Sequence, residues 1–267
     1  MLSSLLFIIY VYDIPMDPKF QTQTSQFADD LGIWTSHPNG AAITRRLQGI
    51  LHDLEKWCSK WRIKLNASKT QLLVMSKMKV QPVINLTLFG TPIQKADNAT
   101  LLGITFDSRL SWNKHMDNIV TKSSRRIGLL RTMRGTQWGA STRTLLKLYC
   151  QYIRPVLEYG AVITVAAFKP QLERLQKVQN CALRVALNLP MTTRIEDLHL
   201  AANIIPVEQR LTELGRKCIK RLKNNSDLFP PILELTQIAY PGRYGFSANR
   251  QGPLEILLPP EEVGAVT

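Results

Sequence analysis

The pattern of apolar residues changes near residue 112, and this change is the strongest constraint on the fold. Before residue 112, apolar segments are mostly short and are separated by turn-forming residues such as Gly90-Thr91-Pro92. After it, apolar residues recur at helical spacing over long stretches. Short segments bounded by turns predict strands, and the longer period predicts amphipathic helices. The sequence therefore predicts an α+β chain: a small antiparallel sheet with helices over 1–111, followed by an all-helical region over 112–226.

Two helices are expected in the first region. Residues 2–12 are apolar on all sides, which predicts a helix end buried in the core. Apolar residues recur at intervals of three and four over 43–61, which predicts an amphipathic helix that packs on a sheet. Trp57 and Trp61 fit the packing face of that helix better than a platform for stacked bases.

The remaining elements follow from the same patterns. Further strands are expected at 63–65, 71–75, 84–89 and 101–106. Helices are expected near 113–134, 141–154, 155–167, 170–188, 194–201 and 206–224. Ser141 or Thr142 could cap the second of these helices, and Pro170 and Pro206 suit first-turn positions. The proline-rich tail, 227–267, is expected to be loose.

Positive charge gathers in the second region. From Lys114 to Lys223 there are 20 Lys/Arg against 7 Asp/Glu, a net charge of +13. The rest of the chain carries 14 Lys/Arg against 13 Asp/Glu. Clustered positive charge favours a polyanionic partner. We therefore expect the two regions to have different roles, with nucleic acid bound by the second.

Neither a membrane-spanning helix nor a secretion signal is expected. The longest apolar run, Leu5 to Tyr12, is far shorter than the roughly 20 residues of a spanning helix, and it lacks the basic start of a signal peptide. The four cysteines lie far apart in sequence, which disfavours a disulfide framework or a zinc site. We expect an intracellular chain, nuclear or cytoplasmic, without a membrane partner.

The strongest chemical signal is Phe27-Ala28-Asp29-Asp30. Residues 21–27 and 31–34 predict a hairpin with both aspartates at its tip. Adjacent carboxylates can hold Mg²⁺, which usually binds one or two carboxylates together with substrate phosphates. Nucleotidyl transfer uses two such ions. An Asp-Asp pair alone is more often a solvated turn, so its sequence context decides.

That context is a series of motifs in a fixed order. They are 2–15, 27–30, 60–70, 102–107 with Leu110-Ser111-Trp112 and His115, then 152–160 and 175–184. In this order they resemble the reverse transcriptase of non-LTR retrotransposons, most closely the jockey group. The likeness covers about residues 1–215. It implies a partial polymerase palm over 1–111 and a thumb-like helical region over 112–226.

The resemblance also implies roles for individual residues. Asp29 and Asp30 would be metal ligands, with Asp29 the direct one and Asp30 its neighbour. Lys69 would assist the leaving pyrophosphate, which an ammonium group can do by donating a proton; a plain surface lysine is the alternative. Leu102 and Gly103 would belong to a primer-grip hairpin, where the bare pattern predicts a core strand.

The basic helices would contact nucleic-acid backbone. The best candidates are Arg125, Arg126, Arg131 and Arg134, each of which could instead lie on a solvated helix face. The partners implied are an RNA template, a DNA primer and dNTPs, and the expected cofactor is Mg²⁺.

The chain departs from the family pattern at two places. The family's fingers, an earlier palm aspartate and a Pro-Gln-Gly-Ser stretch would come before Met1, and Asp13 and Asp17 follow the first helix, so neither replaces that aspartate. Residues 160–164 lack a tryptophan common in the family. We therefore expect a polymerase fragment that is inactive without the N-terminal segment. The alternatives are a non-catalytic nucleic-acid-binding helical protein and an open reading frame that folds poorly.

Overall fold

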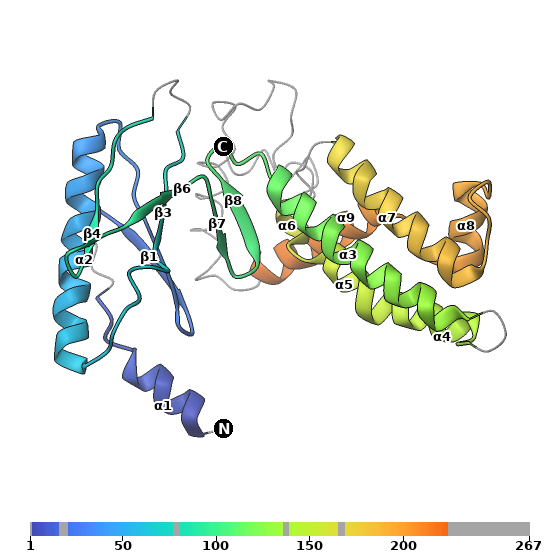
Figure 1. Ribbon diagram of the computed structural model, residues 1–267, viewed down its shortest axis with the longest axis horizontal. Helices are drawn as coiled ribbons and strands as arrows, with labels where there is room; N and C mark the ends of the chain where they lie inside the picture. The colour runs from blue at the N-terminus through green and yellow to red at the C-terminus, as the bar shows by residue number, and fades with distance from the viewer. Residues whose placement is uncertain (1, 16–20, 77–80, 136–138, 165–168, 224–267) are drawn as a thin grey trace. The chain divides into compact units, whose positions relative to one another are not determined.

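The computed structural model describes residues 2–15, 21–76, 81–135, 139–164 and 169–223. The chain divides into two compact units, Met1–Leu110 and Ser111–Thr267. Helices and small, mostly antiparallel sheets make up the first unit, and the described part of the second is helical, so the predicted α+β class is confirmed (Figure 1). The predicted loose tail lies outside the described residues.

The described part of the first unit contains two helices and eight short strands. The helices are α1 (Leu2–Tyr10) and α2 (Gly40–Trp61). The strands are β1 (Gln23–Phe27), β2 (Asp30–Trp34), β3 (Gln71–Leu73), β4 (Thr87–Leu88), β5 (Thr91–Pro92), β6 (Gln94–Ala96), β7 (Asn98–Leu101) and β8 (Ile104–Asp107). β1–β2, β4–β5 and β7–β8 are antiparallel hairpins, whereas β3 and β6 pair in parallel.

Helix α2 is the amphipathic helix that the sequence predicts. It begins after Asn39, whose side-chain oxygen accepts a hydrogen bond from Ala41 N at 2.9 Å. It ends at Arg62, which adopts a left-handed conformation with φ 56°. Its buried face includes Leu51 and Leu54 and packs against apolar residues of the neighbouring strands and loops, Leu72, Val74, Ile84, Leu86 and Leu88.

Helix α1 forms as predicted, but its predicted burial is wrong. All of its residues are exposed, including Leu2 (70%) and Ile9 (64%). Only Val11, just beyond the helix, is buried, against Trp57 and Cys58. An apolar composition shows that burial would stabilise a segment. In the described part of this unit, however, only the residue just after α1 finds an apolar surface to pack against.

Three strand predictions need correction. Residues 63–65 form no strand, and within 84–89 the strand is limited to Thr87–Leu88. The predicted strand 101–106 is instead interrupted by a tight turn at Leu102-Gly103, which joins β7 to β8. Both turn residues have positive φ, 48° and 78°, as a two-residue hairpin turn of type I′ requires.

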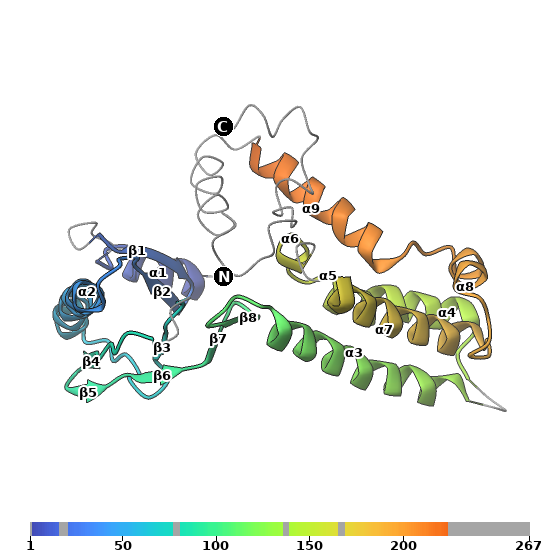
Figure 2. The same cartoon turned by 90° about the horizontal axis from the view of Figure 1, so that it is seen from above.

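The described helices of the second unit surround one apolar core. They are α3 (Asn113–Arg134), α4 (Thr142–Leu148), the π-helical turn η2 (Tyr149–Ile153), α5 (Arg154–Glu158), α6 (Ala161–Thr164), α7 (Lys169–Leu187), α8 (Ile195–Ala202) and α9 (Val207–Lys223). The long helices α3 and α7 run side by side (Figure 2). Tyr149, Leu157 and Leu175 are fully buried between the helices.

The predicted boundary between the helices near 141–154 and 155–167 is not observed. The helical chain continues from Thr142 to Glu158, with Pro155 in the first turn of α5. The π-helical turn η2 precedes it. The predicted helix 155–167 therefore consists of α5 and the short α6, while 165–168 lies outside the described residues. Ser141 is the cap of α4, with its hydroxyl accepting from Thr144 N.

Within the described ranges, no helix is both long and apolar enough to cross a membrane.

Candidate catalytic turn and basic helices

The two aspartates lie at the tip of the β1–β2 hairpin, as predicted. Phe27 pairs with Asp30, so Ala28 and Asp29 form the two-residue turn. Ala28 has φ 52°, and both carboxylates are exposed. Because strand residues alternate between faces, Asp30 points to the side opposite Leu31, which packs toward α2. The hairpin therefore presents its carboxylates to solvent, away from the core.

This pair can supply two oxygen ligands to a cation. Among the residues that the structure describes, no cluster of three or more His, Cys, Asp or Glu side chains could hold a metal ion. Mg²⁺ commonly binds one or two carboxylates and completes its shell with water and phosphate. The two aspartates fit such an open site, in which water and phosphate complete the ligand shell. They do not fit a site in which protein side chains supply all the ligands.

Asp13 has a structural role in the contact between the segment after α1 and helix α2. Its two carboxylate oxygens accept hydrogen bonds from the indole N–H groups of Trp57, at 2.9 Å, and Trp61, at 3.1 Å. The carboxylate thus ties the segment after α1 to α2. The packing role predicted for the two tryptophans is confirmed.

Lys69 lies in a compact turn after α2. The side-chain oxygen of Asn66 accepts from Ser68 N at 3.0 Å and from the Ser68 hydroxyl at 2.6 Å. The Lys69 N–H donates to Asn66 O at 3.1 Å, and the Lys69 side chain is exposed. Its backbone is therefore fixed while its ammonium group is accessible. In the described part of the chain, no ion pair joins Lys69 to Asp29 or Asp30.

The turn of the β7–β8 hairpin is exposed at Leu102 and Gly103. Below it, the hydroxyls of Thr100 and Thr105 lie 3.1 Å apart, and Thr105 is buried. The hairpin therefore projects an apolar side chain, Leu102, 41% exposed, from a polar base.

The four arginines predicted on α3 differ in their surroundings. Arg125 is exposed. Arg126 is held within the unit, because its guanidinium lies 4.3 Å from the ring centroid of Tyr152 and donates to the Tyr152 carbonyl. Arg131 is exposed and reaches Cys181 Sγ on α7 at 3.4 Å. Arg134 is half-buried in the last turn of α3. The Arg126 side chain thus stabilises packing within the unit and is less available to bind a ligand.

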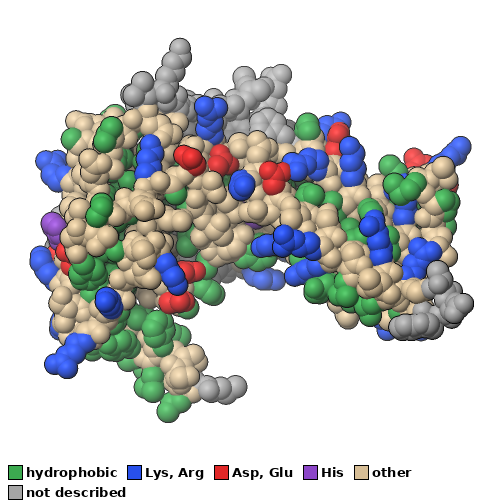
Figure 3. Space-filling view, in the orientation of Figure 1, with side chains coloured by type: hydrophobic (Ala, Val, Ile, Leu, Met, Phe, Trp, Pro, Cys, Tyr) green, Lys and Arg blue, Asp and Glu red, His purple; other side chains and the backbone are tan. Residues whose placement is uncertain are grey.

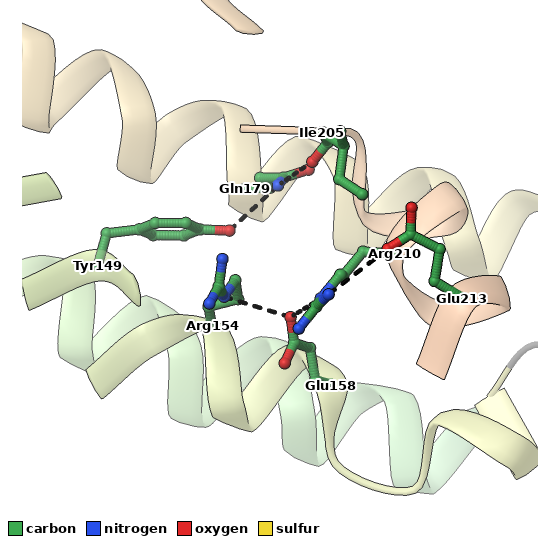
Figure 4. Close-up of polar contacts among 7 residues, drawn as sticks. All are labelled: Tyr149, Arg154, Glu158, Gln179, Ile205, Arg210 and Glu213. Carbon is green, nitrogen blue, oxygen red and sulfur yellow. Dashed lines mark hydrogen bonds and ion pairs between the residues drawn. The ribbon is translucent and has the colours of Figure 1, made fainter. Parts of the chain in front are cut away.

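A polar cluster that the sequence does not reveal links α5 to α9 (Figure 4). Glu158 Oε1 lies 3.3 Å from Arg154 Nε and 2.9 Å from Arg210 Nε. Arg210 Nη1 also lies 3.5 Å from Glu213 Oε2. The hydrogen bond that Arg210 donates to Glu158 raises the pKa of Arg210 above its ordinary value. Residues 52 positions apart are joined here, a distance at which the local pattern carries no signal.

A second buried contact lies beside this cluster (Figure 4). Gln179 donates to the Tyr149 hydroxyl at 3.1 Å and to Ile205 O at 2.9 Å. Burial raises the pKa of Tyr149 far above its ordinary value, so the phenol stays neutral. These contacts join η2, α7 and the segment just before α9. They explain why the polar residues Tyr149 and Gln179 lie on buried faces of the predicted helices.

Comparison with known proteins finds a family match within the first unit. Residues 1–106 match the family described as reverse transcriptase (RNA-dependent DNA polymerase). This range contains Asp29, Asp30, Lys69, Leu102 and Gly103, and ends before the α3 arginines.

Similarity to reverse transcriptases of mobile elements extends into the second unit. The chain is 26% identical over 235 residues to a probable RNA-directed DNA polymerase from transposon BS of Drosophila melanogaster, covering 85% of this chain and 26% of that protein. It is 22% identical over 260 residues to the probable polymerase from transposon X-element of the same fly, covering 96% and 28%. It is 23% identical over 196 residues to the RNA-directed DNA polymerase from the fly's mobile element jockey, covering 73% and 21%.

The resemblance to jockey-like reverse transcriptases is therefore confirmed. The chain spans about a quarter of the length of these curated relatives. No solved structure matches the chain.

Proposed function

We propose that this chain is the part of a retrotransposon RNA-directed DNA polymerase that carries the metal-binding palm turn and the adjoining basic helices. The observation that supports this most directly is the pair of exposed carboxylates at a hairpin tip inside the reverse transcriptase range. The first unit would be a partial palm, and the helices over 112–226 would act as a thumb. RNA template, DNA primer and dNTPs would be the substrates.

Each catalytic group would act through its place in the first unit. Asp29 and Asp30 would hold Mg²⁺ at the tip of the hairpin, and the bound ions would activate the primer hydroxyl and stabilise the leaving pyrophosphate. The ammonium of Lys69 would donate a proton to that pyrophosphate. Leu102 and Gly103 would contact the primer strand.

We propose that the chain by itself does not extend a primer. Two metal ions need more ligands than Asp29 and Asp30 provide, and the described residues bring no third carboxylate, histidine or cysteine to them. A companion polymerase segment would supply the remaining ligands.

Metal binding at the turn can be tested on the chain as it is. Mn²⁺ is a paramagnetic stand-in for Mg²⁺ and broadens NMR signals of nearby amides. We expect selective broadening at residues 28–30, reversed by excess Mg²⁺ and lost in Asp29→Asn. Asp97→Asn, which changes another exposed aspartate of the same unit, is the matched control and should leave the broadening unchanged. Uniform broadening over all acidic residues would remove the support for this site.

The alternative is a non-catalytic protein that only binds nucleic acid. The net charge of +13 over 114–223 favours binding with or without catalysis. Primer extension in the presence of a complementing polymerase segment separates the two: catalysis that depends on Asp29 supports the polymerase, whereas binding without any extension supports the alternative.

A further inference from the structure

A groove of about 340 Å³ lies between α3 and α7 in the second unit. Val120, Ser124, Ile127 and Arg131 line it from α3, and Arg174, Lys177, Val178 and Cys181 line it from α7. Ile127 (3% exposed) and Val178 (8%) form a buried apolar floor. Arg131, Arg174, Lys177 and Ser124 are exposed, so cationic and hydroxyl groups surround that floor.

The charge of the groove is positive. None of its lining residues is acidic. Asp117, one turn before the groove on α3, pairs with Arg174 at 2.5 Å, with both side chains nearly half exposed. Ion pairs this accessible are weak and are readily exchanged. Figure 3 shows Lys and Arg side chains distributed over the helical unit with few acidic ones.

The contact of Arg131 with Cys181 places a guanidinium across the groove. The Nη2–Sγ distance is 3.4 Å, and a thiol sulfur is a weak acceptor. A phosphate oxygen would be a stronger acceptor for the same guanidinium. On α7, Arg174 and Lys177 are three residues apart, so their side chains leave the helix as neighbours.

We propose that this groove binds the sugar–phosphate backbone of one nucleic-acid strand. Arg131, Arg174 and Lys177 take successive phosphates, with the Ser124 hydroxyl as an added donor, and the sugars lie over Ile127 and Val178. Such contacts position a strand and do not read its sequence. The inference rests on the proposed nucleic-acid function and makes it specific, because it assigns binding to two α7 cations and to Arg131, and not to Arg126.

Alkylation of the cysteines tests where the strand lies. Cys181 lines the groove, whereas Cys218 on α9 is also half-buried and does not. A short RNA–DNA duplex should slow the alkylation of Cys181 by iodoacetamide several-fold and leave the alkylation rate of Cys218 unchanged. The full chain is alkylated and then digested, and the rate at each cysteine is measured by mass spectrometry of the peptides. Equal rates at Cys181 with and without bound duplex would overturn the groove assignment. Protection of Cys181 by free dNTP as strong as that by duplex would also overturn it, in favour of a small-anion pocket.

Charge removal tests the same groove independently. The variant Arg131→Gln/Arg174→Gln/Lys177→Gln removes its three cations. The control Arg143→Gln/Lys147→Gln/Lys220→Gln removes three exposed cations from α4 and α9. Each lost phosphate contact lowers the salt slope of log K by about 0.9 on duplex DNA. We expect a drop of roughly 2–3 for the groove variant and less than half of that for the control.

The outcomes separate the two proposals. Equal losses in both triple variants would show that the charge acts as a diffuse field, which contradicts the groove but not nucleic-acid binding. Failure of the unaltered chain to bind the duplex at low salt would contradict the proposed nucleic-acid function itself. Thermal unfolding of both variants should stay close to that of the unaltered chain, because all six side chains are exposed and the Asp117–Arg174 pair lost in the groove variant is solvent-accessible.

Discussion

Replacing Glu158 by glutamine should destabilise the second unit by about 2 kcal/mol. This value lies between the cost of breaking an exposed ion pair and that of breaking a fully buried one. Exposed ion pairs contribute less than about 1 kcal/mol. Removing one partner of a fully buried pair costs about 3–5 kcal/mol, because the other charge stays buried without compensation. The Glu158 side chain is 15% exposed, and those of Arg154 and Arg210 are 32% and 26% exposed. Two partly desolvated guanidiniums would lose their shared carboxylate, which places the cost near the middle of this range.

The assay is urea unfolding followed by far-UV circular dichroism, which reports mainly on the helical unit. Asp117→Asn is the matched control, because it breaks an ion pair whose side chains are 43% and 50% exposed; its cost should stay below about 1 kcal/mol. A further prediction follows from burial: raising the salt concentration should reduce the Asp117 effect more than the Glu158 effect. Equal costs for both variants would refute the view that Glu158 is the ionic link between α5 and α9.

Three further predictions concern other contacts. Burial and the nearby charge of Lys122 lower the pKa of His115, so the unfolded chain binds a proton that the folded chain resists. Stability should therefore fall as the pH drops through and below about 6.5, and His115→Leu should flatten this dependence in urea unfolding. Asp13→Ala removes the shared acceptor of two indoles and should cost about 1–2 kcal/mol and shift tryptophan fluorescence; an unchanged spectrum would contradict the contact. Ser141→Ala removes the cap of α4 and should cost about 1 kcal/mol in thermal unfolding, whereas Ser141→Asp should retain most of the stability.

The long amphipathic helices were the most predictable part of the fold. The stripes of α2, α3 and α7 extend over several turns, so each repeats its signal many times. The hairpin that presents Asp29 and Asp30 was also predictable, because two strand-like segments flank a polar turn. Its location in the structure agrees with the sequence, although metal binding there stays a prediction.

Other features could not be predicted because they depend on contacts distant in sequence. The apolar composition of α1 does not reveal whether a partner surface is present. Leu102 in a left-handed turn gives no turn signal, since leucine rarely adopts positive φ. Pro155 suggests a helix boundary, but the first turn of α5 accepts it. The groove combines Arg131 with Arg174 and Lys177, and only the packing of α3 on α7 brings them together.

The most direct test of the account is a single-turnover primer-extension measurement on a completed polymerase. The chain would be joined at Met1 to the upstream polymerase segment of a jockey-type relative and supplied with Mg²⁺, dNTPs and a primed RNA template. We expect Asp29→Asn to abolish extension with primer–template affinity nearly unchanged, Lys69→Ala to slow incorporation by about 10²–10⁴-fold, and Asp97→Asn to have no effect. Extension by Asp29→Asn as fast as by Lys69→Ala would show that 27–30 is an ordinary turn, and would contradict the assignment of catalysis to this unit.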